Sequence, residues 1–438
     1  MTGGYDNYHY NISSDANNIS AYNLQFDINQ AHLKADLNYY LSTKHTIEFG
    51  AGFVLFKIHP GSYKPVGNES LIKPVEIGSE QGHESAIYLG DKYNITSDLS
   101  IHLGVRYSLY QYLGAQTIYR YAPGLPRKEE NRINEQKYGK GDAINTYHGP
   151  EYRVALRYAF SPVFSIKAGY NSLRQYIHML SNTTAIAPTD IWKLSDPNIP
   201  PQTGDQFSFG LFKNFKSNTI ETSLEVYYKR IKNYLDYKSG AVLILNPTIE
   251  TDVINTRGKA YGLELMVKKV AGKVNGWVSY TYSRTLLRMD DPIAGELINR
   301  GEFYPSNYDK PHDFTLVGNI RISHRFSVSS NITYSTGRPI TLPVARYFYA
   351  GGQRVHYSDR NSFRIPANFR IDLSMNIEGN HKVHQRTHNS WTVGFYNLTG
   401  RKNPYSVYFV TQNGRVNGYK LSIFGSIVPF VNFNIRFE

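Results

Sequence analysis

The sequence predicts an all-β fold, a transmembrane antiparallel β-barrel, and three observations lead to this prediction. Short segments alternate apolar and polar residues, tight turns alternate with long loops, and tyrosine is abundant, with 37 residues in 438. A barrel strand turns only every second residue toward lipid, so its sequence averages out as polar. The mean hydropathy of −0.44 is therefore compatible with a membrane protein.

Alternating residues define the predicted strands. The pattern is clearest at the C-terminus, where polar residues separate four apolar ones, Val431, Phe433, Ile435 and Phe437. The same two-residue period occurs over residues 101–109, 152–160, 314–322 and 369–377. Such alternation indicates a strand with one apolar and one polar face, and it argues against a helix. No apolar run approaches the roughly 20 residues that a membrane-spanning helix needs.

Connections between the predicted strands alternate in length. We expect short turns at 42–45, 96–98, 161–163, 216–218, 271–273 and 324–325. Longer connections lie between them, at 60–80, 113–147, 181–202, 239–251, 287–308 and 341–362. Outer-membrane barrels have short periplasmic turns and long external loops, whereas a soluble propeller or solenoid would repeat at a fixed period.

The strand count is about 16, or about 17 if Tyr8–Ile12 forms a further strand. We expect a single barrel domain over residues 1–438, with residues 1–20 forming an external loop or a remnant strand. The start of the chain has neither the basic nor the apolar region of a signal peptide. We therefore expect that a signal was removed or that the chain begins inside a longer gene product.

The chain is basic and lacks cysteine, with a formal net charge of +13. Lys and Arg are scattered instead of clustered on one face, so we expect no nucleic-acid partner. Solvated loops, a charged lumen and contacts with anionic lipid account for the charge. The absence of cysteine excludes disulfides and thiolate metal sites.

Charged residues on the polar faces would line the lumen. The candidates are Glu48, Arg106, Arg157, Glu225, Arg321 and Arg370. Tyrosines near the predicted strand ends would form the aromatic girdles at the membrane surface, or in some cases stack on a sugar or peptide ligand. These are Tyr39, Tyr40, Tyr112, Tyr227, Tyr228, Tyr280 and Tyr282.

No combination of nucleophile, base and acid stands out, so we expect no catalytic residues, no enzyme activity and no cofactor. His381, His384 and His388 could bind a metal ion if they folded together. A solvated turn is the favoured interpretation, since no carboxylate or cysteine in residues 380–389 completes a ligand shell. We predict no metal site.

Four motifs resemble the C-terminal barrel of TonB-dependent outer-membrane receptors, in the version common among Bacteroidetes-type bacteria. The first two are 189–202, with Trp192 and Pro200, and 307–314, with Pro311 and His312. The third is 334–339, with Gly337, Arg338 and Pro339. The fourth is 397–405, with Asn397, Gly400, Arg401, Asn403 and Pro404. Each motif is weakly specific alone, but all four occur in the family's order.

The resemblance implies a barrel of about 22 strands that an N-terminal domain plugs. A plug, a box for the energy-transducing partner and about five or six strands are not recognisable here, so we expect a C-terminal fragment of a longer receptor. In the family, such a receptor lies in the lipid of a Gram-negative outer membrane. It imports a nutrient, such as an iron chelate, cobalamin, a glycan or a peptide, and it is driven by the TonB complex through its plug.

Two alternatives stay open. The first is a passive porin that is complete in itself, for which about 16 strands is a suitable size. The second is a barrel scaffold in a surface assembly, which would bind other outer-membrane proteins.

Overall fold

The fold consists almost entirely of β-strands. The structure, a computed structural model, describes residues 1–181, 190–291, 293–349, 351–379, 387–412 and 415–437. Helical turns in this part of the chain are 3-10 helices in the connections: η1 (Asn18–Ser20), η2 (Glu129–Asn131), η3 (Ile249–Thr251) and η4 (Ile298–Gly301). Among the described residues, no helix has the length and apolar character required to cross a membrane.

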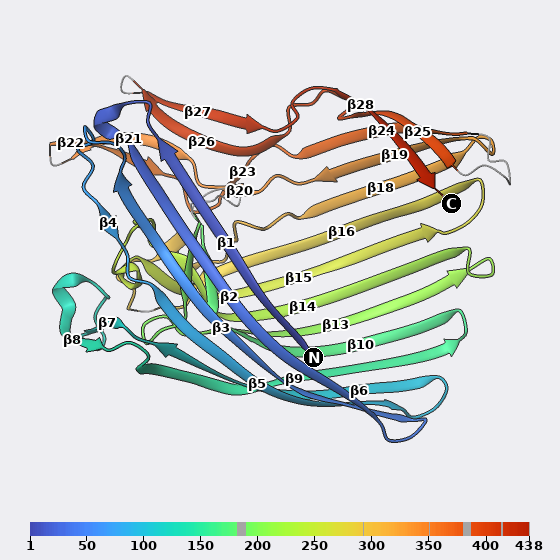
Figure 1. Ribbon diagram of the computed structural model, residues 1–438, viewed down its shortest axis with the longest axis horizontal. Helices are drawn as coiled ribbons and strands as arrows, with labels where there is room; N and C mark the ends of the chain where they lie inside the picture. The colour runs from blue at the N-terminus through green and yellow to red at the C-terminus, as the bar shows by residue number, and fades with distance from the viewer. Residues whose placement is uncertain (182–189, 292, 350, 380–386, 413–414, 438) are drawn as a thin grey trace.

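One curled antiparallel sheet forms the body of the molecule (Figure 1). It has 18 strands, of which β4 (Val75–Glu76) and β17 (Tyr304–Pro305) are only two residues long. The other sixteen pair with one another in chain order. They are β1 (Thr2–Ser14), β2 (Tyr22–Tyr40), β3 (His45–Pro65), β5 (Glu80–Asn94), β6 (Leu99–Leu113), β9 (Ala143–Ser161), β10 (Phe164–Gln175), β13 (Gln202–Phe215), β14 (Ile220–Tyr237), β15 (Val253–Lys269), β16 (Val274–Met289), β18 (His312–Arg321), β19 (Phe326–Ser335), β24 (Asn368–Glu378), β25 (Thr387–Tyr396) and β28 (Val428–Phe437). The predicted number of strands is thereby confirmed.

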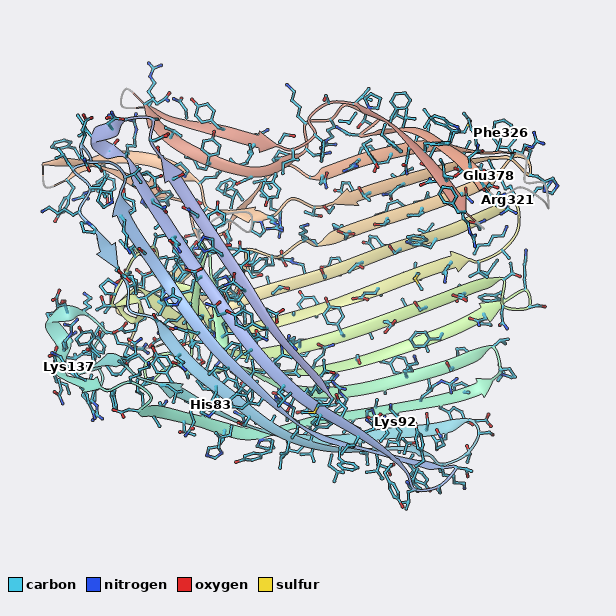
Figure 2. The ribbon with its side chains drawn as sticks, in the orientation of Figure 1. His83, Lys92, Lys137, Arg321, Phe326 and Glu378 are labelled. Atoms are coloured by element: carbon cyan, nitrogen blue, oxygen red, sulfur yellow. The ribbon has the colours of Figure 1, made fainter. Side chains whose placement is uncertain are left out.

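Short turns and long connections lie at opposite ends of the sheet. Figure 2 shows Arg321 and Phe326 at the turn end and Lys137 at the loop end. The long connections form extra two-stranded sheets at the loop end (Figure 1). These pairs are β7 (Gln116–Tyr121) with β8 (Arg132–Tyr138), β11 (Ile177–Leu180) with β12 (Ile191–Leu194), β20 (Pro339–Ile340) with β23 (Phe363–Arg364), β21 (Pro343–Tyr349) with β22 (Gly352–Tyr357), and β26 (Pro404–Gln412) with β27 (Arg415–Ser422).

The apolar rows of the strands lie on the outer face of the curl and are exposed. Large apolar side chains of this face include Leu33, Phe53, Ile87, Phe207 and Val431. An outer face that exposes apolar side chains all around the curl is expected where lipid, not water, is the solvent. The inner face carries the alternate, mostly polar residues.

Buried apolar residues gather at the loop end, inside the curl. One cluster joins inner-face residues of β2, among them Phe26, to Leu180, Ile199 and Leu243 from the inward-folded connections. A second joins Tyr110 and Tyr112 of β6 to the β11–β12 hairpin, and a third lies between β16 and η4. The core is therefore the packing of the loops into the mouth of the curl, and within the part of the chain that the structure describes no second layer covers the sheet.

The sheet has two free edges. In the described part of the chain, β1 pairs only with β2, and β28 pairs only with β25. Figure 1 shows the N- and C-terminal strands on either side of this opening. The fold is thus a barrel wall that is not closed on itself.

Candidate functional site

The predicted lumen residues all lie on the inner face, and two of them, Glu48 and Arg106, border the same cavity. Residues that pair directly across neighbouring strands point to the same face, and the pairing register places all six on the inner one. For example, Arg157 pairs with Lys167, Lys167 with Gly210, and Gly210 with Glu225. The others, Glu48, Arg106, Arg321 and Arg370, follow from the same register. Their predicted role as lumen lining stays a prediction, because it depends on what closes the wall.

Opposite charges on this wall pair with one another across neighbouring strands. Arg106 binds both Glu84 and Glu151, and Glu48 lies between Lys92 and His102. These strands border a cavity of about 630 Å³. Because the charges are internally matched, this part of the wall presents no large excess of either sign.

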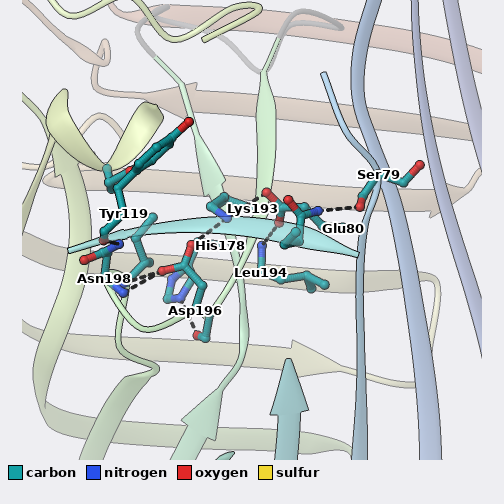
Figure 3. Close-up of polar contacts among 12 residues, drawn as sticks. Ser79, Glu80, Tyr119, His178, Lys193, Leu194, Asp196 and Asn198 are labelled. Atoms are coloured by element: carbon teal, nitrogen blue, oxygen red, sulfur yellow. Dashed lines mark hydrogen bonds and ion pairs between the residues drawn. The ribbon is translucent and has the colours of Figure 1, made fainter. Parts of the chain in front are cut away.

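A buried ion-pair cluster around Lys193 fixes the β11–β12 hairpin inside the mouth (Figure 3). The Lys193 ammonium lies 2.7 Å from Glu80 Oε1 of β5 and 2.7 Å from Asp196 Oδ2. Glu80 also accepts from the Leu194 backbone N–H at 3.0 Å. Burial alone would lower the pKa of Lys193, but the two carboxylates outweigh it and hold that pKa well above its usual value. The motif 189–202 thus has a structural role: it anchors a loop to the wall.

His178 contacts the same cluster as a neutral side chain. Its Nε2 lies 3.0 Å from Ser195 Oγ, and the ring is 2% exposed. Burial, with the nearby Lys193 charge, lowers its pKa from 6.5 to about 4. A serine and a histidine in contact are not by themselves a catalytic pair, because Ser195 is fully buried and no substrate could reach it.

Acidification should therefore loosen this hairpin. A depressed histidine pKa contributes stability that is complete above pH 6.5 and is lost as the pH falls toward about 4. We expect the amides of β11 and β12 to exchange faster over this range, after correction for the intrinsic pH dependence of exchange. His178→Asn should flatten the profile between pH 6.5 and 4; an unchanged profile would show that His178 does not govern the hairpin.

Further buried carboxylates hold the other loops. Asp309 of the motif 307–314 is 1% exposed and binds Arg284 of β16 and Arg364 of β23. Asp236, at the end of β14, binds Arg360 and the Tyr304 hydroxyl. Each of these carboxylates joins segments that are far apart in the chain, so these connections are tied to one another and to the wall.

The remaining motif residues also build turns and contacts between loops. Trp192 packs against the cluster of Tyr110 and Tyr112, and Pro200 lies between β12 and β13. Pro311 directly precedes β18, which begins at His312, and the His312 ring contacts the Tyr280 hydroxyl at 2.9 Å.

The fourth motif forms the turn after β25. The side chain of Asn397 donates to the Arg401 and Phe424 carbonyls. Gly400 has a φ of +61° that suits glycine, and Arg401 donates to the Ala367 carbonyl. Asn403 pairs with both backbone groups of Phe369, just before Pro404 begins β26.

Gly337 occupies a position that has no room for a side chain. A Cβ placed there would lie 1.7 Å from the Ile365 carbonyl oxygen. The next residues bring the two segments together: Ile365 donates to the Arg338 carbonyl at 3.0 Å, and Pro339 opens β20.

Gly337→Ala should destabilise this junction by about 1–3 kcal/mol, because the backbone must move to admit the methyl group. Hydrogen exchange at β20 and β23 would measure the effect. Gly352→Ala serves as the control, because neither Gly352 nor Gly337 has a positive φ and the nearest atom to a Cβ at position 352 would lie 4.0 Å away. An equal effect of both substitutions would exclude close packing as the cause.

Three tyrosines assigned to the aromatic girdle are placed differently. Tyr112 is 2% exposed and packs in the mouth, with the Lys193 ammonium 5.4 Å from its ring centre. Tyr227 lies on the inner face, opposite Gly262, and Tyr40 lies on the inner face two residues after Asn38, the partner of Glu48. For all three the girdle interpretation is wrong, because alternation within a strand decides which face a side chain occupies.

Within the described residues, no group of three His, Asp or Glu side chains is arranged to hold a metal ion. His381 and His384 lie outside those residues, so the interpretation of the histidine segment stays a prediction.

Two further cavities open at the loop end. One of about 220 Å³ lies beside the Lys193 cluster, next to Trp192 and Glu250. Burial raises the pKa of Glu250, whose carboxylate accepts from the Tyr121 hydroxyl at 2.9 Å. The other, of about 390 Å³, lies beside the end of β19, the start of β24 and the turn after β25.

A curled antiparallel sheet with an apolar outer face, a polar inner face and a mouth filled by its own loops defines an outer-membrane β-barrel protein. The family model described as "TonB dependent receptor-like, beta-barrel" matches residues 1–398. The chain therefore belongs to this family, and its place is the Gram-negative outer membrane. The narrower assignment to Bacteroidetes-type bacteria stays a prediction. No curated protein sequence matches the chain.

Several solved structures with a similar fold are receptors. The ferripyoverdine receptor of Pseudomonas aeruginosa matches 99% of this chain and 53% of its own, with 14% identity and a TM-score of 0.54. The ferric-catecholate import receptor Fiu of Escherichia coli matches over 95% and 55%, with 14% identity and a TM-score of 0.53. BauA, the ferric preacinetobactin receptor of Acinetobacter baumannii, matches over 99% and 59%, with 12% identity and a TM-score of 0.58. The chain spans little more than half the length of these proteins.

Proposed function

We propose that the chain is the barrel part of a receptor that imports a scarce nutrient, with energy supplied by the TonB complex through a plug domain. The observation that carries the proposal is the filled mouth. Loops held by Lys193, Asp236 and Asp309 fold into the curl and pack there as a core. Such a mouth suits capture of a specific ligand at the outside, and it does not suit free diffusion.

The free edges support the same proposal. In hydrocarbon, every backbone N–H and C=O must be paired, so the exposed edges of β1 and β28 require partners in the membrane. Additional strands between these edges would complete a wider barrel of about 22 strands, which leaves room for a plug. A sixteen-stranded closure would give the porin alternative.

Candidate substrates follow from the relatives. The three receptors compared above are named for iron chelates, namely ferripyoverdine, ferric catecholates and ferric preacinetobactin. An iron chelate is therefore the first substrate to test, followed by cobalamin, a glycan and a peptide. Binding and uptake, not catalysis, is the proposed role.

Nutrient uptake in the source bacterium tests the function. Deletion of the gene should abolish growth on one limiting nutrient and leave growth on others unchanged. A protonophore should abolish the same uptake in the wild type, because import through a plugged barrel is energised. Uptake that survives the protonophore would identify a porin, and unchanged uptake after deletion, with loss of partner proteins from detergent extracts, would identify a scaffold.

A further inference from the structure

The cavity of about 390 Å³ is lined by cations and by no carboxylate. Lys310, Arg338 and Arg370 contribute to its surface, together with Asn368 and Tyr405. Among the described lining residues there is no Asp or Glu. The charged side chains of this lining are thus cations alone, which distinguishes the hollow from the cavity of about 630 Å³, where Asp36, Glu48, Glu84 and Glu151 contribute to the lining.

Lys310 is the least compensated of these cations. In the described part of the chain, its ammonium has no carboxylate within 4.0 Å and no hydrogen bond, although the side chain is half-buried. On the inner wall, by contrast, Lys92 pairs with Glu48 and Arg106 pairs with Glu84 and Glu151. A half-buried ammonium without a partner costs solvation free energy, and an anion would restore it.

Arg370 is held with one edge of its guanidinium engaged. Its Nε donates to Asp372 Oδ1 at 2.7 Å, and the group lies over the Tyr396 ring at 5.4 Å. Asp372 in turn accepts from the Asn397 backbone N–H at 2.8 Å. The terminal nitrogens of Arg370 have no hydrogen bond within the described residues, so they can donate to a ligand.

The backbone around the hollow is fixed before any ligand arrives. Gly337 and Ile365 are in close contact, and Arg364 ties the Gly337 carbonyl to Asp309. The Asn397 and Asn403 side chains brace the opposite side. A site whose frame is rigid loses little entropy when it binds a ligand.

We propose that this hollow binds an oxyanion group, carboxylate or phosphate, of a small soluble ligand at the inner wall near the external rim. Lys310 and Arg370 supply the charge-assisted hydrogen bonds. Arg338, which directly precedes β20, adds positive charge to the lining. The inference rests on the proposed function, since it gives the imported nutrient, or the group that it presents first, an anionic character.

Binding of citrate and of inorganic phosphate to the full chain in neutral detergent tests the site. Isothermal titration at constant ionic strength should show saturable binding of at least one of the two anions. Lys310→Gln should weaken it about tenfold or more, as expected for loss of one charge-assisted hydrogen bond. The matched control is Lys229→Gln, which removes a half-buried lysine of the inner face outside the hollow and should leave the affinity unchanged.

Other outcomes overturn the proposal. Equal weakening by both substitutions would show a diffuse effect of net charge, and no saturable binding of either anion would show that the hollow is not a site. Competition by an anionic lipid in nanodiscs, absent with neutral lipid, would assign the hollow to a headgroup. The anion-binding experiment and the uptake experiment test different claims. If uptake is unaffected by deletion of the gene but the protein still binds citrate or phosphate, the transport role is rejected and the binding site is retained.

Discussion

Lys193→Met is expected to destabilise the β11–β12 hairpin by about 3–5 kcal/mol, the cost of leaving buried carboxylates without their partner. Glu80 and Asp196 would both lose their cation, and their side chains are only 9% and 7% exposed. The Lys193 side chain is only 7% exposed, so solvent screening does not reduce the effect. Hydrogen exchange at Ile191–Leu194 would measure the free energy of opening.

Lys137→Met is the matched control for this prediction. Lys137 lies on the hairpin β7–β8 at the same end of the molecule (Figure 2), but its side chain is 76% exposed and its pairing with Glu135 is in solvent. An exposed pair of this kind contributes about 0–1 kcal/mol. If the two substitutions had the same effect, the Lys193 cluster would not be what holds the hairpin.

A compensated variant separates charge from packing. Combining Lys193→Met with Glu80→Gln and Asp196→Asn removes all three charges and should recover part of the loss, since a neutral buried cluster avoids uncompensated carboxylates. A triple variant that is as unstable as the sum of its single changes would point to lost side-chain packing instead.

The strands were predictable because the pattern that defines them is local. In β24, Phe369 to Ile377 alternate with polar residues, and lipid on one side and water on the other enforce this alternation at every turn of the pleat. The side of the short turns was predictable for the same reason, as each requires only the two strands it joins. The inner placement of Arg106 also follows from its parity within β6.

The interior of the mouth was not predictable, because its contacts join distant segments. Lys193 and Glu80 are 113 residues apart, and nothing local to either residue selects the other. A weaker indication was present: a lysine between Trp192 and Leu194, with Asp196 three residues on, is unusual in an apolar segment unless it is paired. Similarly, parity with Arg106 would have placed Tyr112 inside, although its position at a strand end favoured the girdle.

Leu373→Arg should destabilise the protein by about 2–4 kcal/mol in a lipid bilayer, the cost of a charged side chain on the lipid face of a barrel near the midplane. Leu373 lies in the middle of β24, on the outer face, where it pairs with Ser330 of β19 and Phe395 of β25. Its side chain is exposed, so no packing within the protein needs to break. Reversible unfolding from vesicles in denaturant would measure the difference.

Ser374→Arg decides what the first substitution means. Ser374 is the next residue of the same strand, and it pairs with Ser329 and Gly394 on the inner face. The guanidinium of an arginine at this position extends into water. The substituent, the strand and the depth in the membrane are then the same, so differences in strand propensity largely cancel, and only the face differs. A cost below about 1 kcal/mol at position 374 against the full cost at 373 would be the effect of lipid alone. Equal costs at both positions would mean that the outer face does not meet hydrocarbon, and the receptor function, which depends on a wall that crosses the membrane, would have to be abandoned with it.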